Sequence, residues 1–232
     1  MTKADIDYHP GQDNKRVSGF DVHHPVFAIS AALAVLVSTI VLAMPGPASA
    51  FLLDLRNQLM SGFDWFFSLS VSLFTLFIIA LGFSPLGRIR LGGADARPQF
   101  GMVSWICMLF SAGVGIGMTF YGAAEPLAYY TGWYGTPFNV EANSAAAENL
   151  ALGATLFNWG IGPWSVYALV GLGMAYFTLN QGLPMAPRSV LYPVFGNRAW
   201  GWPGHIVDLL AILATVFGLA TSLGLGARQA AS

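Results

Sequence analysis

Charged residues are scarce in this sequence, and their scarcity excludes most classes of soluble protein. Only 9% of the 232 residues are Asp, Glu, Lys or Arg, whereas 55% are hydrophobic. Soluble domains carry about 25% charged residues. The formal net charge of −1 also gives no basic excess that would favour a nucleic-acid partner. The composition therefore predicts a chain that lies mostly in a lipid bilayer.

Cysteine is almost absent, and so are the residue groupings of catalysis. Cys107 is the single cysteine, so no intrachain disulfide can form. The sequence contains no nucleophile–base pair, no cluster of metal ligands and no phosphate-binding loop. An enzyme and a resident cofactor therefore have no support in the sequence.

Long uncharged runs are what the sequence does contain, and they predict an all-α membrane protein with five transmembrane helices. About 20 apolar residues, rising about 1.5 Å each, suffice for a helix to cross a bilayer. The first run follows a polar tail at residues 1–24, expected to be flexible, and is therefore not a cleaved signal peptide. Polar residues 54–64 are expected to connect the first two helices. The predicted helices cover residues 26–44, 65–87, 98–124, 150–178 and 208–227.

The third run carries glycines in the middle of its predicted helix. Gly113, Gly115 and Gly117 alternate there, and each glycine in a helix interior costs roughly 1 kcal/mol relative to alanine. Three such residues favour an unwound segment, which in lipid needs partners from protein, water or a ligand. A broken helix at the middle of the bilayer is typical of binding sites in secondary transporters. The alternative is close helix packing, because Gly113 and Gly117 also form a G-x-x-x-G pattern.

A longer stretch around these glycines resembles a known family. The run MLFSAGVGIGMTFYGAAEP at residues 108–126 is similar to the glycine-rich third helix of the betaine/choline/carnitine transporter family. The resemblance favours binding over packing. It implies substrate contacts from Gly113, Val114, Gly115, Ile116 and Gly117.

The fourth predicted helix carries three aromatic residues that can share one side. At about 100° per residue, Trp159, Trp164 and Tyr167 fall within about 140° of one another. Aromatic faces attract a desolvated quaternary ammonium by cation–π interactions worth about 2 kcal/mol. Trp and Tyr in membrane helices more often serve interface belts or packing, but this segment resembles the family's aromatic substrate box. It departs from the family at Asn158 and Gly162, where many members have His.

Hydroxyl residues on the fifth predicted helix form the third match to the family. The corresponding family helix faces the broken helix and contributes hydroxyls to a sodium site, and sodium prefers hard oxygen ligands. The implied ion ligands are Ser111, Val114, Thr215 and Ser222, with Thr221 as a further hydroxyl. Such hydroxyls can instead bond back to carbonyls of their own helix.

Two carboxylates lie within or beside the predicted helices. Glu125 precedes Pro126 near the outer end of the third helix. An interfacial or a hydrogen-bonded structural role is expected there rather than proton relay, because a carboxylate is expensive in hydrocarbon. Asp208 is expected to begin the fifth helix, where a negative charge complements the helix dipole.

Membership of this family would make the chain the amino-terminal part of a sodium symporter for a small quaternary-ammonium or zwitterionic osmolyte such as glycine betaine. Members have about twelve helices in a leucine-transporter-type fold, with two inverted repeats of five after two extra helices. The chain would then be a truncated sequence comprising a cytoplasmic tail (1–24), the two extra helices (25–97) and the first three helices of one repeat (98–232). The resemblance also implies a bacterial inner membrane and a homotrimer.

Two rival functions stay open. The first is proton-coupled or exchange transport of choline or carnitine type. Proton-coupled choline importers tend to have Asp at the position of Gly117, so glycine favours sodium. Leu219 argues the other way, because sodium-coupled members can have a second hydroxyl there. The second rival is a short membrane protein that acts by assembly with other helices, or a truncated membrane fragment that does not transport.

The distribution of basic residues predicts the orientation of the chain. With a cytoplasmic amino terminus and five crossings, eight of the ten basic residues fall inside. They are Lys3, Lys15, Arg16, Arg88, Arg90, Arg97, Arg188 and Arg198. The positive-inside rule therefore favours this orientation.

Cysteine labelling tests this orientation. A cysteine introduced at Asn143 should react with a membrane-impermeant maleimide added outside the cell, and one at Gly92 should react only after the membrane is opened. The reverse pattern would contradict the predicted topology.

Overall fold

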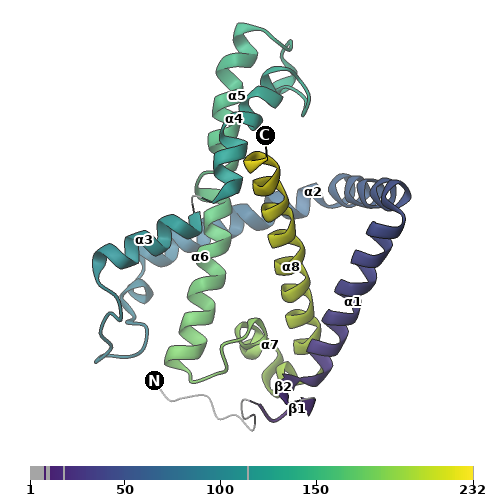
Figure 1. Ribbon diagram of the computed structural model, residues 1–232. Coiled ribbons are helices and arrows are strands. Elements are labelled where there is room, and N and C mark those ends of the chain that lie inside the picture. Colours follow the sequence, from purple (N-terminus) through teal and green to yellow (C-terminus); the bar gives the residue numbers. More distant parts are fainter. Residues whose placement is uncertain (1–7, 9–10, 18, 114, 232) are drawn as a thin grey trace. The chain divides into compact units, whose positions relative to one another are not determined.

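The computed structural model of the protein describes residue 8 and residues 11–17, 19–113 and 115–231, which are mostly helical (Figure 1). Within these residues, three helices are long and apolar enough to cross a membrane. They are α1 (His24–Ala43), α2 (Pro45–Phe83) and α8 (Trp202–Ala230). This architecture agrees with the predicted class of helical membrane protein.

The part of the predicted flexible tail that directly precedes α1 contains two paired strands, and residues 1–7 of the tail lie outside the described residues. Strands β1 (Asn14–Val17) and β2 (Phe20–His23) pair antiparallel, with Val17 opposite Phe20. Gly19, between the strands, has a φ of +88°, which glycine adopts without steric cost. Glycine between two short strands is a common signal of a hairpin turn, but the mixed polar composition of this segment led to the prediction of a flexible tail.

Helix α1 ends as predicted, but α2 is longer than predicted. Met44 separates α1 from α2, which begins at Pro45 because proline suits the first turn of a helix. Helix α2 then continues over 39 residues to Phe83, so the predicted polar connection at residues 54–64 is wrong. Its polar side chains are tolerated on the exposed helix surface, where Gln58 donates to the Asp54 carboxylate at 2.8 Å.

The predicted interruption of the third run is observed. Helix α3 (Met102–Gly113) stops and α4 (Ile116–Tyr130) begins, and Gly115 between them is extended with φ −82° and ψ −173°. The glycine-rich sequence therefore breaks the helix as its low helix propensity predicts.

The fourth predicted helix is also interrupted, which the sequence analysis did not expect. Helix α5 (Ala145–Asn158) and α6 (Ile161–Ala175) are separated by Trp159 and Gly160, and a π-helical turn, η3 (Tyr176–Asn180), follows. Pro163 explains the break. A proline has no N–H to donate to the carbonyl of Trp159, four residues earlier, and its ring would collide with that carbonyl in a continuous helix.

Short turns connect the longer helices. They are η1 (Pro85–Arg88), η2 (Pro137–Asn139), η4 (Pro187–Leu191), α7 (Tyr192–Phe195) and η5 (Gly196–Trp200). The chain forms two compact units, which are described separately below. The first comprises residues 1–95 and 168–217, and the second comprises residues 96–167 and 218–232.

A buried ion pair organises part of the first unit. Asp208 does not begin the last helix as expected, because α8 starts at Trp202 and places Asp208 in its second turn. There the carboxylate accepts hydrogen bonds from the Arg188 backbone N–H at 3.0 Å and from Arg188 Nε at 2.5 Å. Arg188 is 3% exposed and Asp208 is 8% exposed. The pair therefore fixes η4 against α8.

Substitution of either partner should destabilise the protein strongly. In Asp208→Ala the Arg188 guanidinium stays buried without its counter-charge, which costs about 3–5 kcal/mol. The double variant Arg188→Met/Asp208→Leu removes both charges and should regain most of the loss. Thermal unfolding in detergent measures both. Equal stability of the single and double variants would contradict the pairing.

Candidate functional site

In the second unit, the interrupted helix lies against both tryptophans of the predicted substrate box. A Cβ atom at Gly113 would lie 2.9 Å from Cη2 of Trp164, and one at Gly117 would lie 3.6 Å from Cη2 of Trp159. A Cβ at Gly115 would meet no atom within 4 Å. Gly113 and Gly117 therefore allow two indole rings to approach the backbone. The backbone at Gly115, which lies between them in the sequence, borders open space.

The three predicted box residues do not share one continuous helix, so the helix periodicity that predicted their common face does not apply across the break. Trp164 and Tyr167 lie on α6, with ring centroids 5.6 Å apart and 41° between their planes. Trp159 lies in the break itself, and its ring centroid is 6.2 Å from that of Tyr121 on α4. The ring contacts therefore form two aromatic pairs, and the substrate box of three residues stays a prediction.

Glu125 holds Trp159 in this position. Helices α4 and α5 pack side by side (Figure 1), and the Glu125 carboxylate of α4 is 8% exposed. Its Oε2 accepts a hydrogen bond from Trp159 Nε1 at 2.7 Å, and its Oε1 accepts one from Asn158 Nδ2 at 2.7 Å. Asn158 Nδ2 also lies 2.9 Å from the Tyr129 hydroxyl. The hydrogen-bonded structural role predicted for Glu125 is confirmed.

Sequence reasoning missed three residues of this cluster. Tyr121, Tyr129 and Asn158 had no assigned role, although the first two lie in or next to the glycine-rich motif. The available signal was Glu125 itself. A carboxylate inside a long apolar run needs partners, and Asn158 and Trp159 are polar donors in the next predicted helix.

The predicted sodium ligands are distributed over both units. Ser111 on α3 and Ser222 on α8 belong to the second unit, whereas Thr215 belongs to the first. Val114 lies outside the described residues, and Ile116 is the first residue of α4. The sodium site therefore stays a prediction. No group of three His, Cys, Asp or Glu residues that could hold a metal occurs in the part of the chain that the structure describes.

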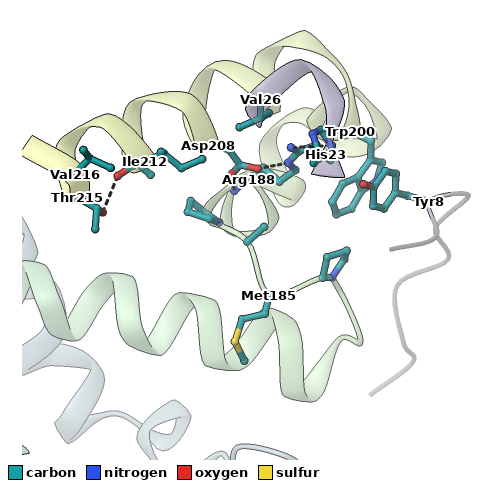
Figure 2. A pocket seen from close by; sticks show the side chains of 14 residues that line it. Tyr8, His23, Val26, Met185, Arg188, Trp200, Asp208, Ile212, Thr215 and Val216 are labelled. Carbon is teal, nitrogen blue, oxygen red and sulfur yellow. Dashed lines mark hydrogen bonds and ion pairs between the residues drawn. The ribbon is translucent and has the colours of Figure 1, made fainter. Parts of the chain in front are cut away.

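Thr215 lines a cavity of about 500 Å³ within the first unit (Figure 2). Its hydroxyl donates to the Ala211 carbonyl at 2.7 Å, which is the back-bonding expected as the alternative to ion binding. Arg188 and Asp208 line the same cavity. Tyr8 also lines this cavity, and its ring is stacked on that of Trp200 with the ring centroids 4.5 Å apart. Burial, together with the negative charge of Asp13, raises the pKa of the Tyr8 phenol above its ordinary value.

Comparison with known proteins agrees with these features. A sequence profile described as the betaine/carnitine/choline family transporter (BCCT) matches residues 25–232. Glycine betaine transporter 1 of Vibrio parahaemolyticus is 55% identical over 227 residues, which is 97% of this chain and 43% of that protein. A glycine betaine/proline/choline transporter of the same organism is 44% identical, over 100% of this chain and 45% of that protein. The glycine betaine transporter OpuD of Bacillus subtilis is 45% identical, over 78% of this chain and 34% of that protein.

The apolar helices and these similarities place the chain in a class of membrane proteins whose characterised members are transporters rather than enzymes. More particularly, the chain belongs to the betaine/carnitine/choline transporter family. It spans less than half the length of the relatives described above.

The two glycines nearest the break should respond differently to alanine. Gly113→Ala places a methyl group against the Trp164 ring, and overpacking of this kind costs about 1–3 kcal/mol. Gly115→Ala meets open space at a φ that alanine adopts readily. The yield of monodisperse protein after detergent extraction should therefore fall for Gly113→Ala and stay near the unsubstituted level for Gly115→Ala. Equal yields would show that the contact with Trp164 does not require glycine.

Proposed function

We propose that the protein containing this chain imports a small quaternary-ammonium or zwitterionic osmolyte, such as glycine betaine, by sodium symport. The observation that carries the proposal is the close approach of Trp164 to Gly113 and of Trp159 to Gly117, on either side of the helix break. Relatives that are named glycine betaine transporters support the choice of substrate class.

The chemistry of the second unit suits a substrate of this class. A trimethylammonium group is large, weakly hydrated and positively charged, so aromatic faces bind it by cation–π attraction. Helix α4 begins at the break without a side-chain cap, which leaves its first backbone N–H groups available. Such groups, at the positive end of a helix dipole, can accept the carboxylate of a zwitterion. The two ends of glycine betaine would thus meet complementary groups.

The same proposal extends to the membrane arrangement. The interrupted pairs α3–α4 and α5–α6 each run over about 30 residues, enough for one crossing at about 1.5 Å per residue. With α1, α2 and α8 they provide five crossings of an inverted-repeat fold in a bacterial inner membrane, with a cytoplasmic amino terminus. Sodium would be bound by the predicted oxygen ligands, and the whole protein would form a homotrimer.

Uptake measurements on the full gene product that contains these residues test the proposal. Trp159→Leu and Trp164→Leu should each weaken uptake of glycine betaine by about tenfold or more, because each removes an aromatic face. Tyr167→Phe keeps its face and should cost less. Replacing external sodium by potassium should abolish uptake.

Two results would contradict the proposal. Unchanged affinity in both tryptophan variants would make these residues packing residues. Uptake that persists in potassium and follows the proton gradient would exclude sodium coupling and leave only the substrate assignment.

A further inference from the structure

The indole N–H of Trp159 is hydrogen-bonded to the carboxylate of the buried residue Glu125. Trp159 Nε1 donates to Glu125 Oε2 at 2.7 Å, and the other carboxylate oxygen accepts from Asn158 Nδ2 at the same distance. Each oxygen therefore faces an N–H donor, which is the hydrogen-bonding pattern of an acceptor-only, ionised carboxylate. The partners are 33 and 34 residues from Glu125 in the sequence.

The opposite end of the same ring lies at the glycine-rich motif. Cη2 of Trp159, on the six-membered part of the indole, is the atom that a Cβ at Gly117 would approach to 3.6 Å. The ring is about half-buried in the folded chain. One side chain thus connects the carboxylate of Glu125 to the backbone segment at which the proposed substrate binds.

We propose that Glu125 is a positioning residue that makes this site selective for cationic head groups. The inference rests on the proposed function. An indole N–H that donates to an anion is polarised, so electron density moves into the ring. A more negative ring face attracts a trimethylammonium group more strongly. The hydrogen bond also holds the ring in one orientation, so Glu125 acts on the substrate through Trp159.

The variant Glu125→Gln separates charge from shape, because glutamine keeps the size of the side chain and one acceptor oxygen. KM and kcat for glycine betaine are measured on the full gene product, with the inhibition constant of 3,3-dimethylbutanoate. This inhibitor has the shape of glycine betaine with an uncharged carbon in place of the nitrogen. We expect KM to rise about threefold or more, kcat to stay within about twofold, and the inhibition constant to stay unchanged. The control is Glu148→Gln, at an exposed position in the first turn of α5. It removes the same charge and should change neither KM nor the inhibition constant.

Two further variants test whether the effect passes through the ring. In a Trp159→Phe background there is no N–H donor, so Glu125→Gln should have no additional effect on KM. The pair Glu125→Gln/Asn158→Asp keeps one carboxylate and one amide in the cluster, which protects folding, but moves the charge away from the indole N–H. The raised KM should persist in this swapped variant.

The outcomes separate the two proposals. If the unsubstituted protein takes up no trimethylammonium compound, both the proposed function and the positioning role of Glu125 are overturned. If uptake occurs, the positioning role alone is overturned by an unchanged KM in Glu125→Gln, or by equal weakening of glycine betaine and its carbon analogue. A Glu125→Gln effect that persists in the Trp159→Phe background, or a normal KM in the swapped variant, overturns it as well.

Discussion

The hydrogen bonds to the Glu125 carboxylate are the interaction on which the second unit depends. In hydrocarbon, a carboxylate, an amide or an indole N–H without a partner costs several kcal/mol. Glu125, Asn158 and Trp159 satisfy one another, so the middle of α4 and the end of α5 cannot separate without leaving the buried Glu125 carboxylate without its two donors. The position of the Trp159 ring follows from this requirement rather than from the local helix geometry.

Two helix interruptions with different chemical causes surround this cluster. Glycine weakens the helix between α3 and α4, whereas Pro163 ends the helical hydrogen bonding between α5 and α6. Gly113 and Gly117 also leave the space that the two indoles fill. The motif therefore combines close packing, at Gly113 and Gly117, with an open backbone segment at Gly115. The sequence alone presented these two features as alternatives.

The first unit shows the same rule with a full ion pair. Arg188 and Asp208 are both buried, and each would be very costly alone. Their bidentate contact joins a short connecting turn to α8 and lies at the wall of the cavity that includes Thr215. Among the described residues, the buried charged side chains Glu125, Arg188 and Asp208 are all hydrogen-bonded to elements that are distant in sequence. An apolar surface alone would not select these pairings, because lipid solvates apolar side chains as well as other helices do.

The sequence by itself determined the properties that depend on neighbouring residues. Long uncharged runs identified a membrane protein, the alternating glycines predicted the break at Gly115, and the motif around them identified the family. The break at Trp159 was also readable, because Pro163 is incompatible with a continuous helix, but the aromatic spacing dominated the interpretation. The polar residues between Asp54 and Asp64 suggested a loop, yet an exposed helix surface accommodates them in α2.

Only the tertiary structure decided that Trp159 pairs with Glu125 and Tyr121, and that Asp208 pairs with Arg188. Such contacts join residues 20 or more positions apart, and helix periodicity carries no information about which distant polar groups meet.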